Sequence, residues 1–511
     1  MKYIISFIFL LSFWINHAQV VNPKIWYVGY QSDLKKDTST PDTAFYIKPH
    51  GSTILNFKSS TISVSRFGYA LSLAACNVQL YDKNDSLILY SNGSKIFNGK
   101  HRLVEGGDSL SYGSDWRTSI FAGNYYGHFL IGSYQNPMIA LPSIKNEAQY
   151  YFISIFISRD FNNNPKLVYS LVDLSLNGGK GIVIEKEIAL KSGELGEAIT
   201  ACKHGNGRDW WIITREYGKK NFIVMLLDSN GIKIHSEPLV SGWDLVDWNA
   251  ERGNFTNQFS WDGSMFASFT HLGVELFDFN RCNGGLTNRR VITIPTSDTI
   301  IYAGAGGFSP NSRLLYLGNR NKYYQADIFN GLKLRKIANY DGYTDTPSGQ
   351  SGGIPTDLGV IQIAHDGKIY MSTTETTRFL HVIENPNDTG ILCNFKQHAI
   401  KLLTFVGGLP KHPNYELGAV ADKCGESGIT DNSLERIEVY PNPVLDKCTI
   451  KGVKFIRPIH YVVYDILGKE LVYGNTAHDI DLSRLSNGYY FIKFTDYKYS
   501  DEVVRRIEIR K

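Results

Sequence analysis

The sequence predicts an all-β protein in which a β-propeller of about seven blades precedes a small C-terminal Ig-like β-sandwich. Three observations support this fold class. Glycine (47 of 511 residues) and aromatic residues (13%) are abundant while charged residues make up only 20%, a pair of strands recurs roughly every 40 to 60 residues, and the tail alternates short strands with turn signals. The formal net charge of +4 is small and spread along the chain, so we expect no nucleic-acid partner.

The N-terminus has the pattern of a secretory signal peptide. Lys2 is followed by an apolar stretch at residues 3–15, which is shorter than the roughly 20 residues that a membrane-spanning helix needs. We predict a signal peptide over residues 1–18, cleaved after Ala18. Since no other stretch approaches transmembrane length, we do not expect an integral membrane protein.

Residues 19–422 are predicted to form the propeller. The repeat is clearest at residues 259–279, 308–327 and 363–383, where Asp or Asn followed by Gly or Ser turns the chain between two strands. The second strand of each copy alternates, so one of its faces can stack on a neighbouring blade. Closure of a ring would bury the edges that an open sheet of this size exposes. Six or eight blades remain alternatives.

Residues 423–436 are predicted to be a linker. They contain Gly425, Gly428 and the pair Asp431-Asn432 but no apolar period. A flexible segment at this place would suit proteolytic cleavage between two domains.

Residues 437–511 are predicted to form the β-sandwich. Pro441 and Pro443 lack backbone donors, so the chain can enter a sheet only at an edge. Several short runs of β-branched and aromatic residues follow, with Gly468 in one turn. Asn487-Gly488 is a strong hairpin signal between residues 480–485 and the strand that leaves it. About seven short strands of this kind are typical of a sandwich.

Three motifs of this tail, residues 440–443 (YPNP), 464–469 (YDILGK) and 485–490 (LSNGYY), precede a basic terminus. Together they resemble the type A C-terminal sorting domain of the type IX secretion system. The resemblance implies passage through the outer membrane by that secretion machinery, cleavage of the tail, and cargo that is secreted or held on the outer cell surface, in some cases by attachment to lipopolysaccharide. The sorting-motif residues that it implies are Tyr440, Pro441, Asn442, Pro443, Asp465, Gly468, Asn487, Gly488 and Tyr489.

The region ahead of the tail resembles the WD-repeat-like propellers common in cargo of this system. The resemblance includes an opening IWYVG at residues 25–29 and a closing LPKHPNY at residues 409–415. It implies an architecture and not an activity.

Motifs for catalysis or metal binding are weak throughout the chain. Residues 349–353 fit G-x-S-x-G, but no strand precedes them and no helix follows, so we expect a loop. Residues 260–263 are faintly similar to the Asp box of sialidases, and residues 82–85 lack the rest of an EF-hand loop. His365 and His381 have turn and strand packing as their default roles. We therefore predict no catalytic residues, no metal and no cofactor.

Aromatic residues offer a possible binding face. Trp210, Trp211, Trp243, Trp248 and Trp261 lie close together in the sequence, and tyrosine pairs occur at residues 125–126 and 323–324. Exposed Trp and Tyr are typical of binding surfaces. Adjacent strand residues point to opposite faces, so at most one of Trp210 and Trp211 can be exposed.

The six cysteines allow two interpretations. They permit up to three disulfides in an oxidising compartment, with 15 possible connectivities for three bonds. Free buried thiols are an equal alternative. Their wide spacing excludes a C-x-x-C motif.

Two functional hypotheses follow. The favoured one is a secreted or surface-displayed propeller that is not an enzyme and binds an unknown protein or glycan. The alternative is a glycoside hydrolase or lyase whose catalytic carboxylates converge at the mouth of the propeller channel.

Overall fold

The computed structural model describes most of the chain after the predicted signal peptide. The described residues are 20–29, 52–67, 73, 76–110, 138–156, 166–193, 195–216, 221–235, 239–240, 256–270, 273–295, 305–346, 352–374, 377–420, 424, 437–451, 459–476, 479–496 and 501–511. They divide into two compact units, residues 1–423 and residues 424–511. The predicted signal peptide lies outside the described residues.

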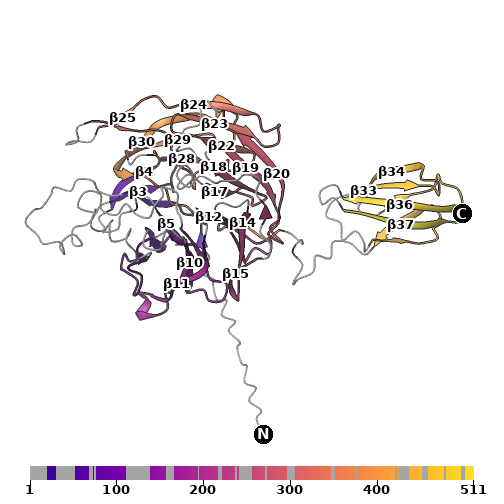
Figure 1. Cartoon of the computed structure of the whole chain (residues 1–511), viewed down its shortest axis with the longest axis horizontal. Helices are drawn as coiled ribbons and strands as arrows, with labels where there is room; N and C mark the ends of the chain where they lie inside the picture. The colour runs from indigo at the N-terminus through magenta and orange to yellow at the C-terminus, as the bar shows by residue number, and fades with distance from the viewer. Residues whose placement is uncertain are drawn as a thin grey trace, which may run out of the picture. The chain divides into compact units, whose positions relative to one another are not determined.

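The first unit is built from antiparallel sheets whose strands mostly follow one another in sequence (Figure 1). Two sheets come first in the chain: β2 (Ile25–Val28), β3 (Ser52–Asn56) and β4 (Ser63–Phe67); and β1 (Val20–Val21), β5 (Val78–Asp82), β6 (Leu87–Ser91) and β7 (Ile96–Asn98). The next two are β8 (Met138–Pro142), β9 (Gln149–Phe156), β10 (Lys166–Asp173) and β11 (Ile182–Ser192); and β12 (Leu195–Lys203), β13 (Trp210–Glu216), β14 (Asn221–Asp228), β15 (Gly231–Ile234) and β16 (Leu239–Val240).

Three further sheets complete this unit: β17 (Thr256–Phe259), β18 (Met265–Thr270), β19 (Gly273–Phe279) and β20 (Leu286–Thr293); β21 (Ala305–Phe308), β22 (Leu314–Gly318), β23 (Lys322–Asp327) and β24 (Leu334–Asn339); and β27 (Ile361–Ile363), β28 (Ile369–Met371), β29 (Thr377–Ile383) and β30 (Phe395–Val406). A short pair, β25 (Thr344–Asp345) and β26 (Ile354–Pro355), precedes the last of them. The helical turns among the described residues are η3 (Asn177–Gly179) and η5 (Gly390–Cys393), and neither has the length or the apolar character to cross a bilayer.

Contacts between neighbouring sheets arrange them in a ring. The first strands meet in order: β8 contacts β12, β12 contacts β17, β17 contacts β21, and β21 contacts β27. The ring is completed because β5 contacts β8, the side-chain amide of Gln79 in β5 donates to the carbonyl of Tyr27 in β2 (2.6 Å), and β30 contacts β3 and β4. Figure 1 shows β12 and β17 near the centre and β15 and β20 further out. This is the arrangement of a β-propeller, as predicted. The number of blades stays a prediction, since the segments between the sheets are only partly described.

The three clearest repeats form the expected turns. Asp262, Asn311 and Asp366 each follow a first strand, and the side-chain oxygen of each accepts the backbone N–H of the residue two positions later, at 3.0, 3.1 and 3.2 Å. Such a bond closes the turn from within, because the short side chain replaces a backbone acceptor. The repeated Asp or Asn therefore has a structural role.

The ring closes between its first and last sheets by side-chain contacts. The hydroxyls of Thr53 and Thr404 lie 2.8 Å apart, and Thr53 also accepts the backbone N–H of Leu403 at 3.2 Å. A Cβ at Gly29 would lie 2.3 Å from the carbonyl oxygen of Phe405, so only glycine fits there. Among the described strands, none from the end of the chain is hydrogen-bonded into a sheet from its beginning.

Residues 409–420, which we call the strap, run from the last sheet to several others. The backbone N–H of Lys411 donates to the carbonyl of Asn77 beside β5 (3.2 Å), and that of Val420 donates to the carbonyl of Gly205 in the β12–β13 turn (2.8 Å). The side-chain amide of Asn414 donates to the carbonyl of Trp261 in the β17–β18 turn (2.9 Å). The strap thus connects sheets from both halves of the ring.

Tyr415 is the largest of the deeply buried side chains of the strap, at 1% exposed. Its hydroxyl donates to the carbonyl of Ala140 in β8 (2.8 Å), its backbone N–H donates to the side chain of Asn22 (3.0 Å), and its ring packs edge-on against Trp210. One residue near the C-terminal end of the propeller therefore holds the N-terminal segment and two sheets.

We expect Tyr415→Ala to lower the free energy of unfolding of the propeller by about 3–5 kcal/mol, as for other buried aromatic residues cut to alanine. Tyr415→Phe keeps the ring and loses the hydrogen bond, so its cost should be about 1–3 kcal/mol. All eight tryptophans lie in the first unit, so tryptophan fluorescence in denaturant reports its unfolding alone. An unchanged midpoint for Tyr415→Ala would show that the strap does not stabilise the ring.

The second unit consists of two antiparallel sheets around one core. One sheet contains β31 (Glu438–Tyr440), β32 (Lys447–Lys451) and β35 (Asp479–Asp481), and the other has the order β34 (Glu470–Thr476), β33 (Ile459–Tyr464), β36 (Gly488–Asp496), β37 (Asp501–Ile509). The buried residues of the two sheets form a single cluster that includes Ile437, Cys448, Val463, Ile492 and Ile507. The predicted Ig-like sandwich agrees with these sheets.

One predicted hairpin in this unit is wrong. The strand before Asn487-Gly488 was expected to pair with the strand after it. Instead, β35 pairs with β32 in the first sheet, and β36 pairs with β33 and β37 in the second. The segment between β35 and β36 crosses between the sheets, and its residues Leu482 and Leu485 are buried. Burial of these apolar residues decides the course of the chain over the local turn signal.

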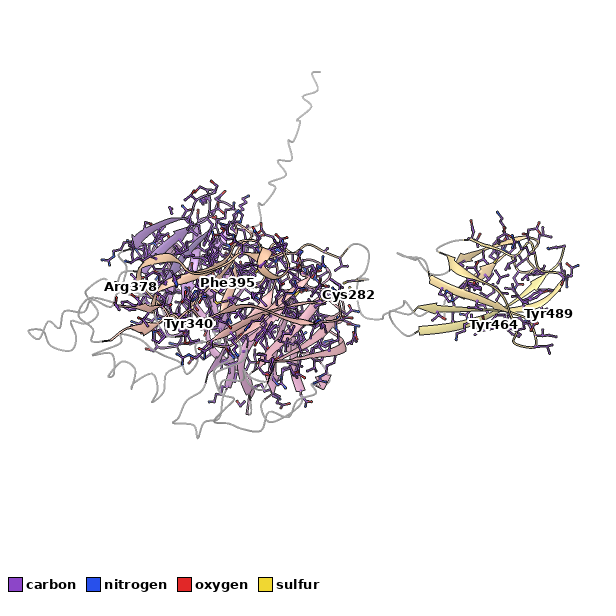
Figure 2. The ribbon with its side chains drawn as sticks, turned by 90° about the horizontal axis from the view of Figure 1, so that it is seen from above. Cys282, Tyr340, Arg378, Phe395, Tyr464 and Tyr489 are labelled. Atoms are coloured by element: carbon purple, nitrogen blue, oxygen red, sulfur yellow. The ribbon has the colours of Figure 1, made fainter. Side chains whose placement is uncertain are left out.

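The cysteines combine both interpretations left open by the sequence. Cys282, labelled in Figure 2, and Cys424 are disulfide-bonded. Cys76, Cys202, Cys393 and Cys448 are buried free thiols. Burial raises the pKa of the Cys76, Cys202 and Cys448 thiols to about 12, so these thiols stay protonated and unreactive at neutral pH.

Candidate functional site

The first sorting motif attaches to the last strand of the chain. Pro441 and Pro443 cannot donate hydrogen bonds, and the side chain of Asn442 between them bonds to β37 in their place. Its oxygen accepts the backbone N–H of Glu508 (2.9 Å), and its amide donates to the carbonyl of Arg506 (3.2 Å). The backbone of Val444 continues this pairing beside the free edge of β37. The motif therefore covers part of an edge strand.

The second motif forms the turn between β33 and β34. The side-chain oxygen of Asp465 accepts the backbone N–H groups of Leu467 (2.8 Å) and Lys469 (3.0 Å), and Gly468 adopts a φ of +81°. That φ favours glycine over any residue with a Cβ. Ile466 and Leu467, at the tip, are 71% and 88% exposed. Asp465 and Gly468 thus hold two apolar side chains out in solvent.

The third motif runs into the start of β36, at the end of the β36–β37 hairpin that lies away from its connecting turn. The side-chain oxygen of Asn487 accepts the backbone N–H of Lys511 (2.7 Å), and Gly488 pairs with Ile509. Tyr489 is 52% exposed on the sheet face, with the guanidinium of Arg506 5.7 Å from its ring centre. Asn442 and Asn487 therefore fasten the same terminal strand, while Asp465 and Gly468 lie in a separate turn.

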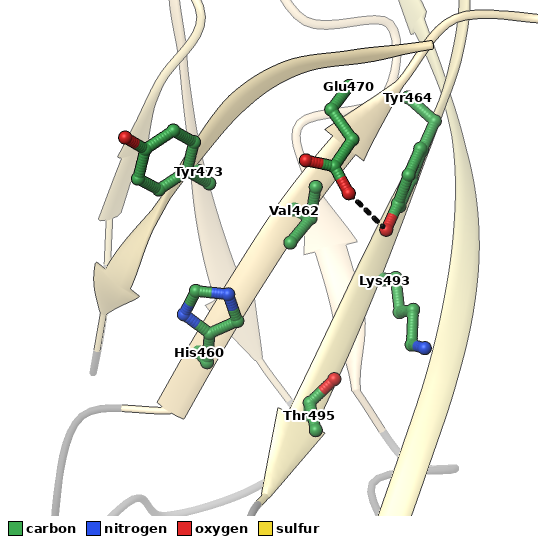
Figure 3. Close-up of a pocket in the computed structure, with 7 residues that line it drawn as sticks. All are labelled: His460, Val462, Tyr464, Glu470, Tyr473, Lys493 and Thr495. Atoms are coloured by element: carbon green, nitrogen blue, oxygen red, sulfur yellow. Dashed lines mark hydrogen bonds between the residues drawn. The ribbon is translucent and has the colours of Figure 1, made fainter. Parts of the chain in front are cut away.

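The outer face of the second sheet carries a shallow pocket that the sequence did not predict (Figure 3). Its volume is about 310 Å³, and it is lined by His460, Val462, Tyr464, Glu470, Tyr473, Lys493 and Thr495. Figure 2 labels Tyr464 and Tyr489 on this unit. Alternation along β33 is the signal that could have revealed it, because His460, Val462 and Tyr464 share one face while Val463 points to the core.

Several buried acidic side chains of the propeller, among them Glu275, Asp345 and Asp357, are paired with arginines. Glu275 is fully buried in β19 and accepts hydrogen bonds from Arg215 in β13 (2.8 Å) and from Arg289 in β20 (2.9 Å). Arg215 comes from the neighbouring sheet, so this network joins two sheets. Its charges serve packing between sheets, since each has a partner at hydrogen-bond distance.

Two more buried acids follow the same rule near the last sheet. Asp345 accepts two side-chain hydrogen bonds from Arg378 (2.6 and 3.1 Å), whose position Figure 2 marks. Asp357 is hydrogen-bonded by Arg320 and by the hydroxyl of Thr374 (2.7 Å). Both carboxylates are therefore held in place by arginine side chains.

His365 and His381 lie in a turn and in a strand, respectively. His365 is exposed in the β27–β28 turn. His381 is fully buried in β29, where its Nε2 lies 3.3 Å from the carbonyl of Asp357 and its Nδ1 accepts the backbone N–H of His398 (2.9 Å). An Nδ1 that accepts a hydrogen bond carries no proton, so the imidazole is neutral.

Burial lowers the pKa of His381 from 6.5 to about 4. The fold therefore favours the neutral ring. The contribution of His381 to the free energy of unfolding is complete above pH 6.5 and declines as the pH falls from 6.5 towards 4. At 1.36 kcal/mol per pKa unit, the loss is about 3 kcal/mol. We expect denaturant midpoints of the propeller to fall across this window, and less steeply in His381→Asn than in the unmodified protein or in the exposed control His365→Asn. Equal slopes in all three would refute the assignment.

The predicted aromatic binding face is wrong for the tryptophan pair at 210–211 and the tyrosine pair at 323–324, whereas Trp261 is partly buried. Trp210 and Trp211 are each 1% exposed, and Tyr323 and Tyr324 are 0% and 5% exposed. The two tryptophans do alternate, since they pack into two different clusters, but both are buried because β13 is covered on both faces. Trp243, Trp248 and the tyrosines at 125–126 lie outside the described residues.

The other candidate motifs for catalysis or metal binding have structural explanations where they fall within the described residues. Ser351 of G-x-S-x-G lies outside the described residues. Asp262 closes the β17–β18 turn, and Asp85 is paired with Lys24 (3.1 Å) and Lys58 (3.3 Å) instead of a metal. Within the described part of the chain, no three His, Cys, Asp or Glu residues gather in a way that could hold a metal ion.

The first strands of the sheets are joined by amide side chains. The side-chain oxygen of Gln258 in β17 accepts the backbone N–H of Phe308 in β21 (2.9 Å), and the amide of Asn257 donates to the carbonyl of Ala198 in β12 (3.1 Å). β8, β17, β21 and β27 contain no Asp or Glu. β12, which lies between β8 and β17 in the ring, contains one, Glu197, so these five strands together offer no carboxylate pair.

Several solved structures resemble the chain at low similarity. A candidate 6-phosphogluconolactonase from Bacteroides uniformis is 12% identical, with 76% of this chain and 98% of that chain covered and a TM-score of 0.44. The periplasmic gluconolactonase PpgL of Pseudomonas aeruginosa is 9% identical (95% and 96% covered, TM-score 0.35). PorZ, a surface component of the type IX secretion system of Porphyromonas gingivalis, is 10% identical (91% and 80% covered, TM-score 0.21). At these values none of them assigns an activity to this chain.

The family comparison concerns the tail. Among curated proteins, no relative matches the chain. Residues 438–510 match the family described as the secretion system C-terminal sorting domain. This agrees with the resemblance in the three tail motifs and indicates a protein that is exported to the cell surface or secreted.

Proposed function

We propose that the propeller is a binding module without catalytic activity, delivered outside the cell by the type IX secretion machinery. Its partner is a protein or a glycan. One observation carries the proposal: the strands β8, β12, β17, β21 and β27, which follow one another around the ring, contain a single carboxylate, Glu197, and neighbouring strands are joined by amides such as Gln258. Hydrolysis of a glycosidic bond commonly needs two carboxyl groups about 5 to 10 Å apart.

The buried acids support the same proposal. Glu275, Asp345 and Asp357 each accept hydrogen bonds from an arginine. Each of these carboxylates is thus held in a structural ion pair within the fold. These acids therefore suit a rigid scaffold better than acid-base catalysis.

We further propose the division of the chain that the sequence predicts: a signal peptide at 1–18, the propeller at 19–422, a linker at 423–436 and the sorting domain at 437–511. In the sorting domain, the nine motif residues from Tyr440 to Tyr489 would maintain the terminal strand and the exposed turn that the machinery reads. Attachment of the exported protein to lipopolysaccharide remains a prediction.

The experiment combines binding and turnover on the purified full chain. Arrays of glycans and of cell-surface proteins give candidate ligands, and the same glycans are then incubated with the protein and analysed by mass spectrometry. We expect a bound ligand that is recovered intact. Cleavage of a bound glycan would contradict the proposal and favour the glycoside hydrolase or lyase.

A further inference from the structure

The pocket on the second sheet of the tail is a groove across three strands. Tyr473 of β34 and Lys493 of β36 both lie opposite Val462 of β33, on either side, and Thr495 lies opposite His460. From His460 to Tyr464 the groove follows β33 for about 14 Å, at roughly 3.4 Å per residue. A rigid sheet holds these side chains in place, so a ligand would bind to a preformed surface.

Two tyrosines stand on either side of an apolar floor. Tyr473 is 75% exposed, and Tyr464 is oriented by the bond from its hydroxyl to Glu470 (3.4 Å; dashed in Figure 3). Because Tyr473 lies opposite Val462, it is diagonal to Tyr464, at a distance of about 7–8 Å for such neighbours. Aromatic faces carry partial negative charge, so they attract the weakly positive C–H groups on the face of a sugar ring.

The rim supplies hydrogen-bonding groups of several kinds. The carboxylate of Glu470 accepts, the ammonium of Lys493 donates, and the hydroxyl of Thr495 does both. Thr495 is only 8% exposed, yet no residue in the described part of the chain hydrogen-bonds its hydroxyl. Its bonding capacity is therefore left for a molecule in the pocket, as expected of a site for a ligand rich in hydroxyl groups.

The charge and the size of the pocket restrict the class of ligand further. The negative charge of Glu470 and the positive charge of Lys493 cancel, so the pocket has no excess positive charge that would attract phosphate or another anion. A volume of about 310 Å³ is at the lower end of small-molecule sites, whereas a protein partner covers about 800 Å² per side, far more than seven residues provide. We propose that this groove binds a short stretch of a neutral oligosaccharide.

The test uses the purified full chain and defined neutral oligosaccharides of glucose, galactose, mannose and N-acetylglucosamine, three to six units long. An array identifies binders, and calorimetric titration measures Kd. We expect Tyr473→Ala to weaken binding roughly tenfold, the effect of losing about 1.4 kcal/mol. Thr495→Val keeps the shape, removes the hydroxyl and should also weaken binding. The control Val504→Ala changes a side chain that is 52% exposed on β37, outside the pocket, and should leave Kd unchanged.

Three results would overturn the inference. One is the absence of binding to every oligosaccharide. Another is binding that Tyr473→Ala and Thr495→Val leave unchanged, which would place the sugar site on the propeller and support the function proposed above. The third is lost export of Tyr473→Ala without any sugar binding, which would assign the groove to a protein of the secretion machinery.

Discussion

Removal of residues 437–511 is expected to keep the protein off the cell surface and out of the medium, and to leave a folded propeller in the periplasm. The reason is that these residues carry the match to the secretion system C-terminal sorting domain, while the core of the propeller is formed within the first unit. Surface labelling and fractionation of cells that express the truncated chain measure the effect. Truncated protein on the surface or in the medium in unmodified amounts would refute the sorting role.

A matched experiment asks whether the tail is sufficient. Residues 423–511 joined to a periplasmic reporter protein should carry the reporter outside. In this fusion, Asn442→Ala removes both side-chain bonds to β37 and should reduce export. The exposed Val504→Ala, on the same strand, is the control. Equal export of the two variants would show that the bonds of Asn442 to the terminal strand do not matter for sorting.

The largest effect of a single substitution on stability is expected at Glu275. Glu275→Gln removes the charge that balances Arg215, whose side chain is 3% exposed. Removing one partner of a buried ion pair costs about 3–5 kcal/mol, because the remaining charge is left in the protein interior without compensation. Denaturant unfolding followed by tryptophan fluorescence should show a clearly lower midpoint for the propeller.

Two further variants make this result specific. Arg215→Met combined with Glu275→Leu removes both charges and should recover most of the loss. Asp278→Asn breaks the pair with Arg290, in which both side chains are partly exposed, and should cost about 0–1 kcal/mol. If Glu275→Gln unfolds at the same midpoint as the unmodified chain, the network does not contribute to the packing of the two sheets.

Features with a local cause could be predicted from the sequence. The turns at Asp262, Asn311 and Asp366 are set by a side chain that bonds two residues ahead, so the strands on either side could be recognised. The tail could be recognised for a similar reason, because Asn442, Asp465 and Asn487 each form hydrogen bonds determined by their own motif.

Features that depend on the neighbour of a strand could not be predicted. Trp210 and Trp211 point to opposite faces of β13, and both are buried because both faces of this strand are covered by neighbouring sheets. No local sequence pattern reveals that covering. The pairing of β35 with β32 overrode the hairpin signal at Asn487-Gly488 for the same reason. The groove was missed because Tyr473 comes from a different strand than Tyr464, and only the register of β33 with β34 brings them together.

The strap sets the boundary of what can be cut from this protein without damage. Its last described bond to the ring is that of Val420 with Gly205, and Tyr415 is already inserted five residues earlier. A protease that acts after Cys424, which is itself disulfide-bonded, therefore releases a propeller with its closure intact, whereas one that acts before Tyr415 detaches the segment that holds Asn22 and Ala140. Cleavage of the exported protein would thus leave the propeller stable when it falls beyond Cys424 and would destabilise it when it falls earlier in the chain, before Tyr415.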